Sequence, residues 1–169
     1  VSGGKKPVIA YTAGFSDRPS EVASIGMDGK GDKVLTALND DVLPFLDMAK
    51  VEEIHVASRA DGREIEAWVA LPPDFKADGS FPLILEIHGG PYAMYSPFFG
   101  SEIQRYAAEG YVTVWTNPRG STGYGEDFAQ LIDQAYPGND YEDLMSVVDD
   151  LVAKNYASKD RLFVTGGSG

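Results

Sequence analysis

The 169 residues carry a formal net charge of −12, are 43% hydrophobic and contain no cysteine. The negative charge argues against nucleic acids and anionic membranes as partners, because both would repel the chain. No apolar run reaches the roughly 20 residues that span a bilayer, and the N-terminus does not read as an intact signal peptide. Without cysteine there are no disulfides or thiol nucleophiles, and a cytoplasmic or a periplasmic location stays open.

The first fifty residues predict a small antiparallel β-structure. Residues 7–13, 21–27 and 33–39 are short runs rich in β-branched and aromatic side chains, and turn-forming residues separate them. Three such strands make a meander that is too small to hold a core alone. It is either a strand set added to another sheet or one blade of a β-propeller. The turn DGKGDK lacks the ligand pattern of an EF-hand, so we expect no calcium there.

The remainder, residues 51–169, predicts an α/β domain. Residues 51–58 and 63–72 alternate in polarity around RADG and indicate an antiparallel hairpin. Strands at 82–87, 111–117 and 161–165 then alternate with helices at 101–110, 126–136 and 140–155. This order is typical of parallel strands joined by crossover helices. We therefore expect two domains, a meander over 1–50 and an α/β domain over 51–169.

The segment VTGGSG, residues 164–169, suggests a reactive serine. A strand that turns abruptly with Ser168 at its apex and glycines beside it matches the nucleophile elbow, in which a tight bend holds the hydroxyl clear of the sheet. The N–H of Gly169 would then face a developing oxyanion. The pattern G-x-S-x-G needs one more glycine after Gly169. The alternative is a flexible Gly/Ser tail, but the apolar strand leading into it favours the elbow.

The segment EIHGGPY, residues 86–92, follows an earlier strand. Gly89 and Gly90 would let backbone N–H groups face a substrate oxygen, which is the second half of an oxyanion hole, whereas the alternative is an ordinary tight turn. We do not interpret His88 as a catalytic base, because the elbow architecture puts the triad acid and histidine after the serine. His55 reads as a surface or sheet residue, and two isolated histidines make a poor metal site. We expect neither a metal nor a cofactor.

The loop NPRGSTGYG, residues 117–125, is rich in glycine but contains no G-K-[ST]. A phosphate cradle is therefore disfavoured. A structured loop at the rim of the active site is the better interpretation.

Taken in this order and spacing, HGGP, NPRGSTGYG, DYEDLMSVVDDLVAKN and RLFVTGGSG resemble the prolyl oligopeptidase family of serine peptidases. The resemblance covers roughly residues 51–169 and is nearest to the acylaminoacyl-peptidase and dipeptidyl-peptidase branches. It implies that the first fifty residues are the end of a β-propeller and that the rest is the N-terminal part of an α/β-hydrolase domain. Ser168 matches the nucleophile of the family, Gly169 one oxyanion donor, and the segment from His88 to Gly90 the other.

The resemblance implies cleavage of short peptides through an acyl-enzyme on Ser168. The triad Asp and His of the family lie downstream of the serine, so we expect these 169 residues alone to be inactive. The rest of a longer parent, with propeller blades and the downstream segment, would complete the site, and oligomer formation stays open. Two alternatives remain, an α/β-hydrolase esterase and a catalytically dead binding homologue.

Overall fold

The computed structural model describes residues 6–168. The chain divides into two compact units. One comprises Val1–Asp47 and Pro97–Ser101, and the other comprises Met48–Ser96 and Glu102–Gly169. Among the described residues, no helix has the length and apolar character needed to cross a membrane.

The first unit contains a three-stranded antiparallel sheet of order β1-β2-β3. Its strands are β1 (Val8–Ala13), β2 (Glu21–Gly26) and β3 (Lys33–Val34), and a short 3-10 helix, η1 (Leu43–Phe45), follows. The predicted meander is present, but its third strand has two residues instead of seven. The reason lies at Glu21, whose buried carboxylate accepts hydrogen bonds from the Thr36 hydroxyl and from the Leu38 N–H. These bonds replace the ladder pairing that a longer strand would make.

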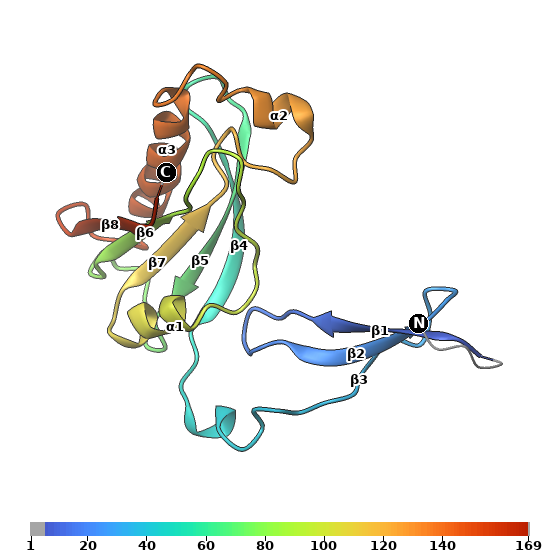
Figure 1. Cartoon of the computed structure of the whole chain (residues 1–169). Coiled ribbons are helices and arrows are strands. Elements are labelled where there is room, and N and C mark those ends of the chain that lie inside the picture. The colour runs from blue at the N-terminus through green and yellow to red at the C-terminus, as the bar shows by residue number, and fades with distance from the viewer. Residues whose placement is uncertain (1–5, 169) are drawn as a thin grey trace. The chain divides into compact units, whose positions relative to one another are not determined.

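The second unit is built on a five-stranded sheet of order β4-β5-β7-β6-β8 (Figure 1). The strands are β4 (Lys50–Ala57), β5 (Glu64–Leu71), β6 (Leu83–Ile87), β7 (Val112–Thr116) and β8 (Leu162–Gly166). The predicted hairpin is formed by β4 and β5, and β5 pairs antiparallel with β7. β6 runs parallel to both β7 and β8. Consequently the ends of β6 and β8 meet at one edge, where Ile87 pairs with Gly166.

Both faces of this sheet are covered. Helix α3 (Asn139–Ala153) lies along one face (Figure 1), and Leu144, Val147, Val148 and Leu151 enter the larger core cluster. The apolar residues that recur at helical spacing along α3 therefore form its buried face. On the opposite face, Trp68 and Trp115 stack at a centroid distance of 6.3 Å and pack with Ala107 of α1 (Ser101–Ala108). The observed architecture is α/β, as expected.

The helix predicted over 126–136 is wrong in length. Helix α2 spans only Glu126–Gln130, and the chain continues in turns in which Gln134 adopts a φ of 53°. The turns bury Ile132 against Gly120, where an added Cβ would come within 2.7 Å of the Ile132 side chain. Tertiary packing of Ile132 therefore competes with continuation of the helix.

Candidate active site

Ser168 follows β8 through a sharp bend. Its φ is 66°, a left-handed conformation that non-glycine residues rarely adopt and that is often found at functional sites. Two residues earlier, a Cβ on Gly166 would lie 2.4 Å from the Ile87 carbonyl oxygen on the neighbouring strand. Only glycine allows β8 to approach β6 this closely. The bend therefore requires the glycine that precedes it, and it leaves the Ser168 side chain exposed.

The segment after β6 lies directly against this bend. A Cβ on Gly89 would be 2.4 Å from the Gly167 carbonyl oxygen and 2.9 Å from the Ser168 Cβ. Gly90 follows with a φ of 59°. Among the residues that the structure describes, neither the Gly89 nor the Gly90 N–H donates a hydrogen bond to another residue. The loop thus carries two unused backbone donors, and Gly89 lies directly against the serine bend.

His88 is fixed by its ring. Ser121 donates its hydroxyl hydrogen to the Pro118 carbonyl at 2.7 Å, so the 2.9 Å contact with His88 Nε2 is a bond in which the imidazole donates. The ring also packs edge-on against Tyr95, with centroids 5.3 Å apart. His88 therefore connects the end of β6 to the 117–125 loop, and its ring nitrogen Nε2 is already engaged.

Asn117 is a second connection between the segment after β6 and the 117–125 loop, and it is only 1% exposed. Its amide oxygen accepts the Tyr95 N–H at 2.7 Å, and its NH₂ donates to the Tyr95 carbonyl at 3.1 Å and to the Tyr124 hydroxyl at 2.7 Å. Tyr124 in turn donates to the Glu66 carboxylate. Burial raises the pKa of Tyr124, so it stays protonated as a donor. The buried Asn117 amide, whose hydrogen-bonding groups all have partners, therefore joins the loops that flank the site.

Arg119 anchors the 117–125 loop to the domain. Its guanidinium bonds to the fully buried Asp143 carboxylate of α3 at 2.9 and 2.8 Å, and its two terminal nitrogens reach Asp61 at 3.1 Å. The hydrogen bonds that Arg119 donates to Asp143 raise the pKa of Arg119, and those that it donates to Asp61 lower the pKa of Asp61. Each charge of this network has an opposite partner, as burial requires. The arginine joins the loop, the helix and the β4–β5 turn.

A pocket of about 110 Å³ opens beside the glycine loop, which comprises residues 88–91 after β6. His88, Gly90 and Pro91 line one side, and residues of the 117–125 loop, of the segment after α2 and of α3 line the other. Apolar groups provide most of its wall, which suits a small apolar side chain of a ligand.

The structure brings Ser168 and Gly89 into contact and places His88 and Gly90 beside them in the chain. Gly169, the other expected oxyanion donor, lies outside the described residues. The sequence reasoning missed Asn117 and Arg119 as fixing residues. An Asn-Pro-Arg run directly after a buried strand is a signal that could have pointed to them.

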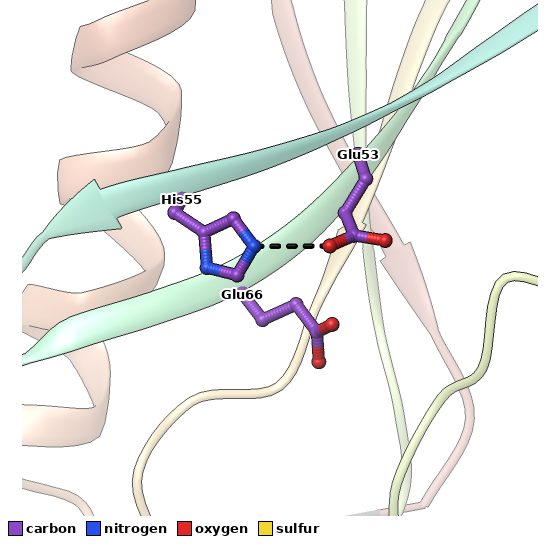
Figure 2. Close-up of side chains that lie close together, drawn as sticks. All are labelled: Glu53, His55 and Glu66. Atoms are coloured by element: carbon purple, nitrogen blue, oxygen red, sulfur yellow. Dashed lines mark hydrogen bonds and ion pairs between the residues drawn. The ribbon is translucent and has the colours of Figure 1, made fainter.

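The sequence reasoning also missed a cluster on β4 and β5. Glu53, His55 and Glu66 lie together on one face of the hairpin (Figure 2), with ligand-type atoms all within 4.8 Å of one another. The strand pattern around His55 indicates only a surface or sheet residue. The alternation Glu-x-His on one strand, paired with Glu-x-Glu on the next, was the available signal.

Comparison with known proteins bears on the origin of this site. Residues 97–169 match the sequence model described as the Prolyl oligopeptidase family. This part of the chain is therefore similar to the prolyl oligopeptidase family. The match includes the serine bend, the 117–125 loop and α3, so the resemblance seen in the sequence motifs is confirmed.

Relatives and solved structures extend the likeness over nearly the whole chain. The Uncharacterized peptidase YuxL of Bacillus subtilis is 41% identical over 153 residues, which are 90% of this chain and 23% of that protein. The acylaminoacyl peptidase of Pyrococcus horikoshii is 29% identical with a TM-score of 0.82, over 97% of this chain and 26% of that one. An acylaminoacyl peptidase in complex with Z-Gly-Gly-Phe-chloromethyl ketone is 28% identical, with a TM-score of 0.83 and shares of 97% and 26%. The chain thus spans about a quarter of the length of these proteins.

Proposed function

We propose that the whole protein is a serine peptidase of the prolyl oligopeptidase type in which Ser168 is the nucleophile. The observation that carries this proposal is the contact at Gly89. The loop after β6 lies so close to the serine bend that a single methyl group would collide with it. Such an approach, with unused N–H groups beside a left-handed serine, has no evident purpose in packing but matches what acyl transfer needs.

In the proposed reaction the Ser168 Oγ attacks the carbonyl carbon of a peptide bond, and the carbonyl oxygen becomes an oxyanion. The N–H groups of Gly89, Gly90 and Gly169 are the candidate donors to that oxygen. The Oγ proton passes to a general base and then to the leaving amine, and water hydrolyses the acyl-enzyme. The base and its acid partner would come from residues outside this chain.

His88 takes a supporting part in this proposal. Its Nε2 donates to Ser121, so the ring fixes the segment whose backbone amides face the oxyanion. Asn117 fixes the following residues through both backbone groups of Tyr95. An oxyanion hole works because its donors are held in place before the charge develops, and these bonds supply that rigidity.

We further propose that residues 1–50 are the end of a β-propeller and that residues 51–169 are the first part of an α/β-hydrolase domain. The three-stranded antiparallel sheet and the separate compact unit at the N-terminus support the first assignment. The parallel trio β7-β6-β8, with the serine at the end of β8, supports the second.

Short peptides are the proposed substrates. A solved relative binds a peptide chloromethyl ketone, and relatives are named as peptidases. The pocket beside Gly90 would receive one small apolar side chain, which favours a peptide with such a residue near the cleaved bond.

Hydrolysis of short peptidyl-aminomethylcoumarins by the whole protein tests the function. We expect turnover that disappears in Ser168→Ala while the folded state, followed by circular dichroism, is retained. Equal activity in the two proteins would contradict the role of Ser168. Turnover of p-nitrophenyl esters without any turnover of peptides would favour an esterase instead.

A further inference from the structure

The β4–β5 hairpin bears a group of side chains of metal-ligating type. This group is far from Ser168 in the sequence. Glu53 and His55 are two residues apart on β4, so they face the same side of the sheet. Glu66 is the direct cross-strand partner of His55. A paired β-hairpin fixes the backbone beneath all three side chains, as Figure 2 shows.

The His55 ring lies between carboxylates. Its Nε2 is 3.0 Å from a Glu53 oxygen, and its Nδ1 is 3.2 Å from a Glu64 oxygen. Within the part of the chain that the structure describes, no lysine or arginine forms an ion pair with Glu53, Glu64 or Glu66. The excess negative charge therefore has no fixed cationic partner except the imidazole itself.

The spacing of the donor atoms suits one small cation. A tetrahedral Zn²⁺ with ligand bonds of about 2.0–2.1 Å holds its ligand atoms about 3.3 Å apart. The three donor atoms already lie within 4.8 Å of one another, and their side chains are long enough to close the difference. An imidazole nitrogen among carboxylates favours transition metals over Ca²⁺ or Mg²⁺, which prefer oxygen alone.

The surroundings also match a metal centre. Glu64 is placed to accept the Nδ1 hydrogen of His55, which would leave Nε2 as the metal-binding nitrogen and fix the ring. Tyr124 bonds to the Glu66 carboxylate and orients it. A hollow of about 140 Å³ adjoins these side chains and has room for a water molecule as a further ligand.

We propose that Glu53, His55 and Glu66 bind one divalent transition-metal ion, of which Zn²⁺ fits best, with Glu64 orienting the imidazole. This site is independent of the proposed peptidase function, and its test needs no catalytic activity.

Isothermal titration calorimetry of the whole protein with Zn²⁺ tests the proposal. We expect saturable binding that His55→Ala and Glu66→Gln each weaken at least tenfold. Glu109→Gln is the matched control, because it removes one exposed carboxylate outside the cluster and should leave the affinity unchanged. All three positions are exposed or only partly buried, so the variants should fold.

Thermal unfolding provides a second readout that does not depend on the heat signal. Zn²⁺ should raise the Tm of the unsubstituted protein and of Glu109→Gln, but not the Tm of His55→Ala. The proposal is overturned if the protein shows no saturable Zn²⁺ binding. It is equally overturned if binding and the Tm shift survive both His55→Ala and Glu66→Gln.

Discussion

At the scale of single residues, Gly89 is a tightly constrained position beside the serine. A Cβ there would meet the Gly167 carbonyl oxygen at 2.4 Å, and a backbone atom cannot swing aside as a side chain can. Gly89→Ala should therefore push the loop away from Ser168. We expect kcat of the whole protein to fall roughly 100-fold, as for an ångström-scale misplacement of a catalytic group.

The same substitution should lower stability by about 1–3 kcal/mol, since it overpacks a tight contact. Gly167→Ala provides the comparison for stability, because a Cβ there would have no neighbour within 4 Å. Urea unfolding should show a smaller loss for Gly167→Ala than for Gly89→Ala. Equal stabilities of the two variants, with full activity in Gly89→Ala, would refute the close approach of the loop.

His55 offers a prediction on pH. The hydrogen bond to Glu53 raises the pKa of the imidazole above its usual value near 6.5, and Glu64 and Glu66 add to this effect. Protonated His55 is therefore favoured in the folded state, and the small stabilisation it gives is present below the ordinary pKa and is lost as pH rises through the raised pKa.

The change Glu53→Gln should lower the pKa of His55, because it removes the largest contribution. A histidine ring-proton NMR titration without metal would measure this directly. An unchanged midpoint in Glu53→Gln would show that the two side chains do not interact in solution.

At the scale of elements, Asp143 ties helix α3 to the 117–125 loop. It accepts from the Arg119 side chain and from the Arg119 backbone N–H at 2.8 Å. Both side chains are nearly inaccessible, so Asp143→Asn leaves an arginine charge buried with only Asp61 as an opposite charge. We expect a loss of about 3–5 kcal/mol in the free energy of unfolding, as for one partner removed from a buried ion pair.

Asp150→Asn is the control on the same helix. Asp150 pairs with Lys154 at an i,i+4 spacing on the surface, and such pairs contribute about 0.3–0.5 kcal/mol. Urea unfolding of the two variants should therefore separate them clearly. If Asp143→Asn were no worse than Asp150→Asn, Arg119 would not be the anchor described above.

The elements that the sequence predicted well are those whose pattern is local. The stripe of Leu144, Val147, Val148 and Leu151 has helical spacing, and the alternation in β5 has strand spacing. The elements that it predicted poorly are set by contacts distant in sequence. The hydrogen bond that Leu38 donates to Glu21 replaces ladder pairing after β3, and packing of Ile132 on Gly120 ends the helical run.

At the scale of the whole molecule, the serine bend and the glycine loop were recognisable because each motif is a few consecutive residues at the end of a strand. Their contact was expected because the two motifs supply the two halves of one oxyanion hole, and it depends on β6 and β8 being neighbours. The network around Arg119 and the cluster around His55 could not be predicted. Arg119 reaches Asp61 across 58 residues, and Glu66 meets His55 only through the register of the hairpin.

The chain covers only part of the length of its relatives, and this affects the activity that we expect of the 169 residues alone. The chain spans 23% of one relative and 26% of a solved structure. A serine without a general base is a weak nucleophile at neutral pH, because its hydroxyl proton has no acceptor. We therefore expect the 169-residue polypeptide to lack peptidase activity although it contains Ser168.

Labelling with a fluorophosphonate, which reacts with activated serine hydroxyls, tests the proposed role of Ser168 most directly. We expect the whole protein to be labelled once, on the peptide that contains Ser168, and Ser168→Ala to remove the label. The 169-residue polypeptide should stay unlabelled under the same conditions. Labelling of the whole protein at another serine, or stoichiometric labelling of the short polypeptide, would show that the proposed role of Ser168 is wrong.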